Sequence, residues 1–269
     1  MKLLFSIILF LVSLTIKGQE LYSVTEPASN IAAGSIGLRI DNSVMNERNS
    51  SKTNLHIIPQ VLVGISKKWM VQGNVFLSNR SEALSTEGGS VYAKYRFLSN
   101  DGQHTHFRMA AFGRISYNNS DIHQQDINLY GHNSGFELGL IATQLIRKVA
   151  LSSAVSFLKA MDNGNNNQFI YGQKESKALN HTLSVGKLML PKEYKDYNQT
   201  NINLMLEILT QYNTGSEKFY VDIAPSVQAI INSRSRVDIG YRKELSSSMI
   251  RTAPNGFFIR LEHNLYNVL

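Results

Sequence analysis

Segments of about ten residues in which apolar and polar side chains alternate recur along most of the chain, with polar turns between them. The segment Val91–Phe97 is typical, because Tyr92, Lys94 and Arg96 alternate with Val, Ala, Tyr and Phe. Successive side chains of an extended strand point to opposite faces, so each segment has one apolar and one polar face. The pattern predicts an all-β fold.

The alternating segments predict twelve strands, with the approximate ranges 34–42, 53–65, 68–79, 89–99, 104–117, 134–146, 149–160, 177–190, 200–212, 218–231, 235–243 and 256–269. Strands of soluble proteins average about 5–6 residues, whereas tilted strands of about 9–11 residues cross a bilayer. A closed barrel is the sheet that pairs every backbone group in lipid. We therefore expect a closed antiparallel transmembrane β-barrel of about 12 strands, with 10–14 possible. The alternative is a soluble sandwich with a wet polar face.

The polar face of the predicted strands is expected to line the interior, and the apolar face is expected to contact lipid. Val61 and Leu204 lie on the nearly charge-free apolar face, whereas their neighbours Gln60 and Asn203 lie on the polar face. Charged residues with the inward phase are the candidate lumen-lining residues. They are Arg39, Asp41, Lys94, Arg96, Arg108, Arg114, Glu137, Glu207, Asp222, Arg236, Asp238, Arg242, Arg260 and Glu262.

These candidates comprise eight bases and six acids, which allows two interpretations. The charges could pair with one another and fill a closed barrel, or they could line a pore that slightly prefers anions. Eight strands enclose a filled interior and sixteen enclose a channel, so a barrel of twelve strands fits either. The sequence leaves open whether the lumen is open along its axis or is plugged by side chains or by segment 20–33.

The first residues have the composition of a secretory signal. Lys2 precedes an apolar run that ends at Ile16, and the small residue Gly18 precedes Gln19. These features are typical of a signal peptide, although the cleavage position stays open; the alternative is a buried N-terminal helix. The predicted organisation is a signal peptide at 1–18, an N-terminal periplasmic segment at 19–33 and a transmembrane barrel at 34–269.

The composition narrows the function classes. Hydrophobic residues make up 43% of the chain and charged residues 17%, and a soluble domain typically has about 25% charged residues. The net charge of +7 is spread along the chain, with no basic run longer than Lys67-Lys68, so no nucleic-acid partner is expected. The chain has no Cys and therefore no disulfide framework. No run of 18 apolar residues occurs, so no membrane-spanning helix is expected.

The turns between the segments alternate between long and short, which predicts the orientation of the barrel. Bacterial barrels have long extracellular loops and short periplasmic turns. We therefore expect the Asn- and Gln-rich loops 118–133 and 161–176 to be extracellular and the turns 66–67 and 147–148 to be periplasmic. Two connections are exceptions to the pattern: 191–199 is long for a periplasmic turn, and 213–217 is short for an extracellular loop.

Few residues have the spacing of a catalytic or metal site. His104 and His106 share one face of a strand and could bind a metal, but a polar turn is the simpler interpretation. Ser153 and His181 share the lipid-facing phase of neighbouring strands, as a Ser/His lipid hydrolase would require. No phosphate-binding or zinc-protease motif is present. We expect no enzyme activity, catalytic residue, cofactor or metal, and the roles of these histidines stay open.

Several stretches resemble a family of membrane barrels. The last residues, "FFIRLEHNLYNVL", resemble the C-terminal strand by which bacterial barrels are recognised for assembly, although Leu269 replaces the usual final aromatic residue. The signal ending "KGQ" and the stretches "TEPASN" (Thr25–Asn30), "GGSVYAKYRF", "FRMAAFGRISY", "RVDIGYR" and "RTAPNGFF" resemble an uncharacterised family of Bacteroidota-type outer-membrane β-barrel proteins. This resemblance covers nearly the whole mature chain. It implies the barrel fold and the outer membrane of a Gram-negative bacterium, and it carries no site residues across.

The charged lumen and the barrel pattern together predict a channel or transporter for a small polar or anionic solute in the outer membrane. The first alternative is a closed structural or surface-interaction barrel without transport. The second alternative is a rim-located lipid-modifying enzyme. The expected partners are outer-membrane lipid and, during biogenesis, the barrel-assembly machinery. The sequence does not identify the solute. The barrel is expected to be a monomer.

Overall fold

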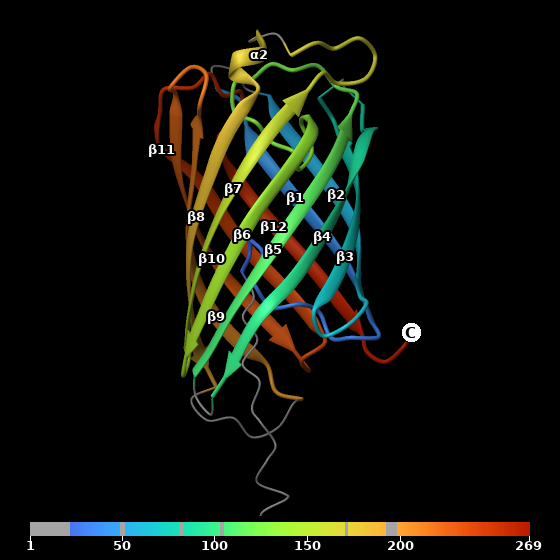
Figure 1. Ribbon diagram of the computed structural model, residues 1–269, viewed down its shortest axis with the longest axis vertical. Helices are drawn as coiled ribbons and strands as arrows, with labels where there is room; N and C mark the ends of the chain where they lie inside the picture. Colours follow the sequence, from blue (N-terminus) through green and yellow to red (C-terminus); the bar gives the residue numbers. More distant parts are fainter. Residues whose placement is uncertain (1–21, 49–51, 81–82, 103–104, 170–171, 192–197) are drawn as a thin grey trace, which may run out of the picture.

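Antiparallel strands form a closed barrel in the computed structural model, which describes residues 22–48, 52–80, 83–102, 105–169, 172–191 and 198–269 (Figure 1). Within these ranges, twelve strands follow one another round the wall in chain order, and β12 pairs with β1. The strands are β1 (Ser35–Asn46), β2 (Thr53–Gly64), β3 (Trp69–Ser78), β4 (Ser85–Asp101), β5 (Thr105–Asn118), β6 (Ser134–Ile146), β7 (Val149–Met161), β8 (Lys177–Leu190), β9 (Asn201–Asn213), β10 (Phe219–Ile231), β11 (Ser235–Ser247) and β12 (Asn255–Leu265). A helix of four residues, α2 (Gly172–Glu175), precedes β8. The expected fold class is confirmed.

The strands follow the alternation of the sequence closely. β6 and β8 have the predicted bounds, whereas β4 is longer than predicted and has 17 residues. β12 ends at Leu265, and the amides of Val268 and Leu269 then donate to the carbonyl of Gly34. These two hydrogen bonds attach the end of the chain to the start of β1, beside the seam where the barrel closes.

The two faces of the wall differ in exposure as the alternation predicts. On β2, Val61 is 47% exposed, whereas its neighbour Gln60 is 3% exposed. On β9, Leu204 is 46% exposed and Asn203 is 9% exposed. Large apolar side chains therefore cover the outside of the barrel, and its inside holds the buried polar and charged side chains together with apolar ones such as Leu62 and Phe76. This arrangement is the reverse of a soluble domain and suits a barrel that lipid surrounds.

Two prolines lie inside strands and interrupt the pairing on one side only. The pairing of β2 with β3 has a gap between Ile57 and Gln60, on either side of Pro59. The pairing of β10 with β11 has a gap between Ile223 and Ser226, which flank Pro225. Proline has no amide hydrogen to donate, so the pairing is lost toward one neighbour. Pairing continues on the other side, toward β1 and β9, and the barrel stays closed.

The two ends of the barrel carry different connections (Figure 1). α2 and the long connections, including 119–133 and 162–176, lie at one end, which we call the loop end. The short connections 147–148 and 232–234 lie at the other end, which we call the turn end. That the loop end is extracellular stays a prediction. In the part of the chain that the structure describes, no helix has the length and hydropathy to cross a membrane.

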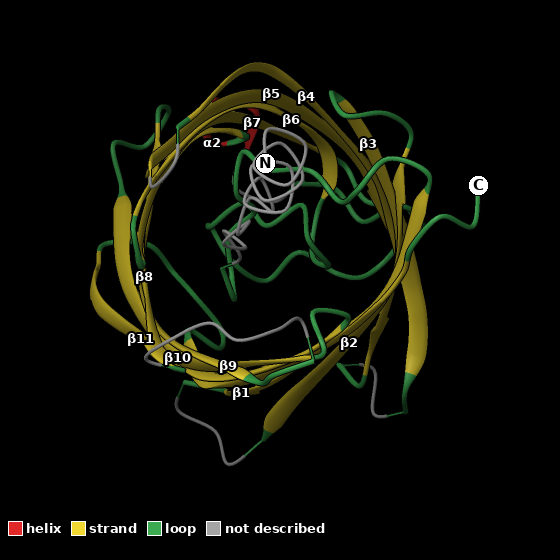
Figure 2. Ribbon diagram, turned by 90° about the horizontal axis from the view of Figure 1, so that it is seen from below, coloured by secondary structure: helices red, strands yellow, loops and turns green. Residues whose placement is uncertain are grey.

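Residues 22–33, which we call the N-terminal segment, lie inside the barrel (Figures 1 and 2). Seen from the turn end, parts of the chain that belong to no strand lie within the ring that the strands enclose. Tyr22 and Ala28 are buried there. Polar groups of the wall bind residues 22–33 inside the barrel, and the predicted division into a signal peptide, a periplasmic segment at 19–33 and a barrel stays a prediction. The expected signal peptide, 1–18, lies outside the described residues.

Candidate functional site

The interior of the barrel, called the bore below, carries a group of paired charges on three adjacent strands. Cross-strand pairing places Arg39 of β1 opposite Glu262 of β12, and it places Asp41 opposite Arg260. On the other side of β12, Arg236 of β11 lies opposite Glu262. Directly opposite residues share one face of a sheet, so all these side chains point into the bore. We call this group the charge cluster; its members are Arg39, Asp41, Arg236, Asp238, Arg260 and Glu262.

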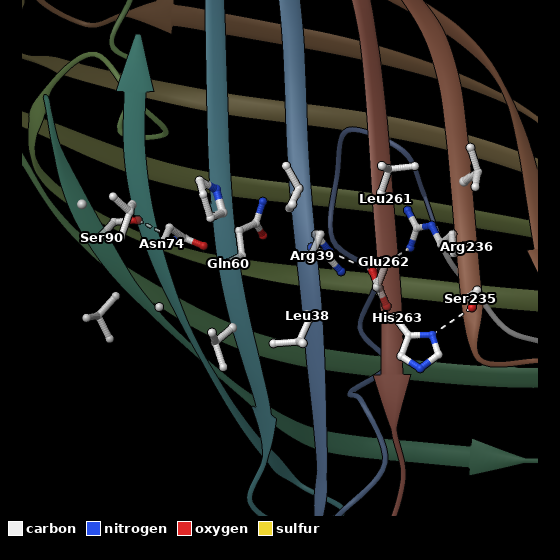
Figure 3. A pocket seen from close by; sticks show the side chains of 18 of the residues that line it. Leu38, Arg39, Gln60, Asn74, Ser90, Ser235, Arg236, Leu261, Glu262 and His263 are labelled. Carbon is white, nitrogen blue, oxygen red and sulfur yellow. Dashed lines mark hydrogen bonds and ion pairs between the residues drawn. The ribbon is translucent and has the colours of Figure 1, made fainter. Parts of the chain in front are cut away.

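Short hydrogen bonds join the bases and acids of the charge cluster. Arg39 Nε donates to Glu262 Oε2 at 2.8 Å, and Figure 3 shows this pair. Arg260 Nε donates to Asp41 Oδ1 at 2.6 Å, and its Nη2 donates to Asp41 Oδ2 at 2.7 Å. Arg236 Nε donates to Asp238 Oδ2 at 2.9 Å. Because Arg presents a planar fork of donors, such two-point contacts orient both side chains and also place opposite charges next to each other.

The N-terminal segment adds one acid to the charge cluster. Arg39 Nη1 donates to Glu26 Oε1, and Arg260 Nη1 lies 4.0 Å from the same oxygen. Burial favours the neutral form of a carboxyl group, but attraction to Arg39, and next to Lys94 and Arg260, outweighs it and lowers the pKa of Glu26. Glu26 is therefore a carboxylate inside the bore.

Lys94 of β4 binds the main chain of the N-terminal segment. Its Nζ donates to the carbonyl oxygen of Pro27 at 2.6 Å and to that of Ser29 at 2.7 Å. The side chain of Lys94 is fully buried. A buried ammonium group requires several acceptors to compensate for lost hydration, and the segment supplies two of them.

The opposite side of the segment binds an acid of the wall. The amides of Ser23, Val24 and Thr25 donate to the carboxylate of Glu207 on β9, at 2.9, 2.7 and 2.8 Å. The hydroxyl of Thr25 donates to the same carboxylate at 2.7 Å. Successive amides that point to one side form a concave anion-binding surface. The segment thus presents an acid to the bases of the wall and amide donors to an acid of the wall.

Contacts of the segment extend round the whole wall. The side chains that form hydrogen bonds with residues 22–29 come from at least nine strands: Arg39 (β1), Lys94 (β4), Arg108 (β5), Thr143 (β6), Ser184 (β8), Glu207 (β9), Ser226 (β10), Arg236 (β11) and Arg260 (β12). Strands on opposite sides of the barrel are among them. The segment therefore crosses the bore from wall to wall.

Loop 119–133 enters the bore from the loop end. Its apolar side chains pack with inward residues of β7 and β8 and with loop residue Phe169, in a cluster of Ile122, Ile127, Leu129, Leu158, Ala160, Phe169 and Ala178. Tyr130 Oη donates to Asp41 Oδ2 at 2.6 Å, so the loop also reaches the charge cluster. Gln124 and Gln125 are buried. Their side chains bind Thr252, Glu175, Lys218 and the amide of Ile250, which all belong to connections of the loop end.

A second group of charges surrounds Arg251, in the connection between β11 and β12. Arg251 Nη1 and Nη2 donate to the two oxygens of Asp222 at 2.7 and 2.8 Å, and Nη1 also donates to Glu244 at 3.0 Å. Arg242 shares Asp222, with an N–O distance of 2.6 Å. The guanidinium carbon of Arg251 lies 3.9 Å from the ring centre of Tyr220, in cation–π geometry.

The remaining candidate residues lie apart from these two groups. Arg114 Nε donates to Glu137 Oε2 at 3.3 Å, across the pairing of β5 with β6. Arg108 Nη2 donates to Asp101 Oδ1 at 2.7 Å near the turn end. Arg96 donates to the carbonyl oxygen of Lys67, in the connection between β2 and β3, at 2.6 Å. Arg96 and Arg108 therefore lie at the rim of the turn end.

Sequence reasoning missed Glu26, Asp126 and Arg251. All three lie outside the strands, where alternation assigns no direction to a side chain. Asp126 Oδ2 lies 3.4 Å from Arg251 Nε, so these two residues join loop 119–133 to the connection before β12. Glu26 could have been noticed as the only charged residue between positions 22 and 33.

The histidines considered in the sequence have other contacts. His106 Nδ1 lies 2.8 Å from Asp101 Oδ1, whereas His104 lies outside the described residues. The described ranges contain no group of three or more His, Cys, Asp or Glu side chains that could hold a metal ion. On the outer face, His181 Nε2 lies 3.1 Å from Ser153 Oγ, which satisfies both polar groups at an exposed position.

The outer face also has a broad depression of about 1200 Å³ over β1 and its neighbours (Figure 3). Leu38 and Leu261 are exposed on its rim, and Gly73 and Gly89 leave its floor without bulky side chains. Ser235 Oγ lies 2.9 Å from His263 Nδ1 at one edge. Its lining also includes Arg39, Gln60 and Glu262, whose side chains point into the bore.

Solved structures share this architecture. An outer membrane channel from Pseudomonas putida F1 matches with a TM-score of 0.56 at 11% identity, covering 90% of this chain and 99% of that chain. The NanC porin matches with a TM-score of 0.50 at 10% identity, covering 84% of this chain and 97% of that chain. No family model and no curated protein sequence matches the chain.

At these identities the similarity shows the fold. The chain has the fold of an outer-membrane β-barrel. The barrel and its apolar outer face agree with the expected location in the outer membrane of a Gram-negative bacterium.

Proposed function

We propose that the protein is an outer-membrane channel or transporter for a small polar or anionic solute, and that the N-terminal segment closes its bore in the state seen here. The observation that supports this most directly is the nature of the obstruction. The segment precedes β1 and is held by polar contacts, and the barrel pairing runs from β1 to β12 without it. The wall would therefore stay closed round a polar bore if the segment withdrew.

The lining of the bore supports the same conclusion. Gln60, Gln72 and Asn74 form a row of buried amides on β2 and β3, linked by hydrogen bonds of 2.8 and 2.6 Å. Together with the charged side chains, these amides give the wall a hydrophilic lining. A barrel that serves only as a structural element could be filled with apolar side chains at lower cost, since buried charges lose hydration.

Conductance in planar bilayers tests the proposal. The variant keeps the length of the chain but has residues 22–33 replaced by Gly and Ser, which removes Glu26 and the main-chain contacts fixed by this sequence. Loop 119–133 stays in the bore in this variant, so we expect an increase in single-channel conductance over the unchanged protein and not the conductance of an empty barrel. A control variant carries the same Gly/Ser replacement in residues 214–218, at the loop end, and should behave as the unchanged protein does.

If the variant folds and does not conduct, the closed structural barrel is the better description of the protein. Folding is checked by the heat-dependent mobility shift of barrels on gels. A monomer, assembly by the barrel-assembly machinery and membership of the Bacteroidota-type family are part of this proposal and stay predictions.

A lipid-modifying enzyme is the second candidate, and one observation favours it. Ser153 Oγ and His181 Nε2 are within hydrogen-bond distance on the exposed outer face. A nucleophile and base in this arrangement normally need a third group that orients the base, and such a group is not found among the described contacts of His181. Hydrolysis of phospholipid vesicles that is lost in both Ser153→Ala and His181→Ala would support the enzyme over the channel.

A further inference from the structure

We propose that the bore binds a small organic carboxylate at the position of Glu26, and that this binding releases the N-terminal segment. The inference rests on the proposed channel function, because it names the class of solute and the step that opens the bore.

Glu26 is the only charged residue of the N-terminal segment, and it points at bases of the wall. Residues 22–33 otherwise contain small, polar and apolar side chains. The carboxylate contacts Arg39 and lies 4.0 Å from Arg260, two bases on adjacent strands. The segment therefore carries the chemical group of a small carboxylate into a site that the wall provides.

The bases of the site keep all their acceptors only while the carboxylate of the segment is present. The charge cluster holds three bases and three acids of the wall. Lys94 is a fourth base and acts on the same carboxylate. Without Glu26, Arg39 would keep only Glu262 as a carboxylate partner, and Lys94 would lose two carbonyl acceptors. Loss of acceptors by buried bases is costly, so another anion in the place of Glu26 would favour withdrawal of the segment.

The geometry favours a carboxylate with hydrogen-bond donors over a simple anion such as chloride. Two guanidinium groups approach one side of the Glu26 carboxylate, and planar guanidinium groups match carboxylate oxygens in geometry. When the segment leaves, Glu207 loses the amides of Ser23, Val24 and Thr25. A solute with hydroxyl groups can supply such donors. Gluconate has both features, and sorbitol has its hydroxylated carbon chain without the carboxylate.

A glycine of the wall makes room for the segment. A Cβ atom at Gly64 would lie 2.0 Å from the carbonyl oxygen of Ala32, which no side chain can tolerate without a shift of the main chain. At Gly73, on the outer face, a Cβ atom would have no neighbour within 4 Å. Gly64→Ala is therefore expected to displace the segment without any ligand, and Gly73→Ala is its matched control.

The experiment measures release of the segment directly. The chain has no Cys, so Ala28→Cys introduces a single thiol, at a side chain that is fully buried between the segment and the wall. The purified full-length variant in detergent micelles is mixed with a polar maleimide, and the labelling rate is recorded. Gluconate is added at increasing concentration, with sorbitol and with potassium chloride of the same ionic strength as controls.

We expect gluconate to raise the labelling rate about tenfold or more in a saturable manner, since it replaces a charge-assisted hydrogen bond of the segment. Sorbitol and potassium chloride should have little effect. Glu26→Gln should raise the rate without gluconate, whereas Glu26→Asp should keep it low. Gly64→Ala should also raise it, and Gly73→Ala should not. If Ala28→Cys fails to fold, Asn30→Cys provides a second reporter on the same segment.

Equal effects of gluconate, sorbitol and potassium chloride, or no effect of gluconate, would overturn the inference. Labelling that Glu26→Gln does not change would also overturn it. The channel function is tested separately, because labelling needs no conduction. If the Gly/Ser variant conducts but gluconate does not release the segment, the channel proposal is supported and the carboxylate site is rejected. If gluconate releases the segment but no variant conducts, the carboxylate site is supported and the channel proposal is rejected.

Discussion

At the scale of single residues, the buried charges depend on a complete set of partners. Asp222 is fully buried and shares its two oxygens between Arg242 and Arg251. Taking charges out of water costs several kcal/mol per ion, and only close partners compensate for it. The contribution of a charged residue to the stability of this barrel therefore depends more on how deeply it is buried than on whether it has a partner.

Arg251 and Arg48 provide a direct comparison. Both pair with Glu244, but the side chain of Arg251 is 3% exposed and that of Arg48 is 44% exposed. We expect Arg251→Gln to lower the free energy of unfolding by about 3–5 kcal/mol, because it leaves Asp222 and Asp126 short of a base. Arg48→Gln should cost about 1 kcal/mol or less. Urea unfolding in lipid vesicles measures both, and equal costs would contradict the burial argument.

His132 makes the loop end sensitive to acid. Arg80 Nη1 lies 2.9 Å from His132 Nδ1 and must be the donor, so His132 accepts in its neutral form. Burial, and then repulsion from Arg80 and from the stacked His56, lower the pKa of His132. Glu87 pairs with Arg80 and partly offsets its charge, whereas Arg242 and Arg251 add to the repulsion. Protonation would therefore break the contact with Arg80.

The direction of the pH effect follows from this lowered pKa. The unfolded chain takes up the proton at about pH 6.5, and the folded chain takes it up only at lower pH. The contribution of His132 to stability is thus fully present above about pH 6.5 and is lost by about 1.4 kcal/mol for each pH unit below it. Thermal unfolding between pH 7.5 and 5 should show a smaller loss for His132→Gln, which still accepts from Arg80. An unchanged pH dependence in this variant would contradict the assignment.

At the scale of the strand, the depth of an outward side chain in the membrane decides the cost of a charge. Leu206 lies in the middle of β9, and Ile202 lies on the same face near the turn end. We expect Leu206→Arg to destabilise the barrel by about 2–4 kcal/mol and Ile202→Arg by about 0–1 kcal/mol. Unfolding in vesicles measures the difference. Equal costs would mean that β9 does not span the bilayer in the way its apolar face indicates.

At the scale of the whole molecule, two parts of the chain enter the bore from opposite ends and meet at one ion pair. Asp41 accepts from Arg260 and from Tyr130 of loop 119–133, and Arg260 also lies 4.0 Å from Glu26. Arg260 Nη1 further donates to the carbonyl oxygen of Tyr22 at 3.4 Å. The Arg260–Asp41 pair thus connects the loop to the N-terminal segment, and a shift of either part acts on the other.

The charge of the open bore predicts its ion preference. The candidate lumen-lining residues include two more bases than acids, and Glu26 reduces this excess while the segment is present. We expect the Gly/Ser variant of residues 22–33 to prefer anions by a few-fold, because low-dielectric walls concentrate the field of the bases. High salt should weaken the preference by screening. Reversal potentials in a potassium chloride gradient measure it.

Arg39→Gln in the Gly/Ser variant tests whether the charge cluster causes the anion preference. It removes one base from the charge cluster and should reduce the anion preference. Arg48→Gln, at an exposed position of the loop end, is the control and should leave the preference unchanged. A cation-selective bore, or equal effects of the two substitutions, would exclude the charge cluster as the source of selectivity.

The sequence alone determined the barrel, its strands and the direction of most side chains in it. A strand has a period of two residues, so the alternation of Val61 with Gln60 or of Leu204 with Asn203 assigns each residue to a face without knowledge of the rest of the chain. Lipid outside the barrel selects apolar side chains for one face, which keeps this signal clear through all twelve strands.

The tertiary structure alone decided what fills the bore. Glu26, Tyr130 and Arg251 lie in segments without a repeating pattern, so nothing in the sequence indicates which way they point. Their positions depend on contacts with residues far along the chain, such as Glu26 with Arg39 and Tyr130 with Asp41. Polar segments have no apolar face to bury, and they enter the barrel because its buried charges require partners there.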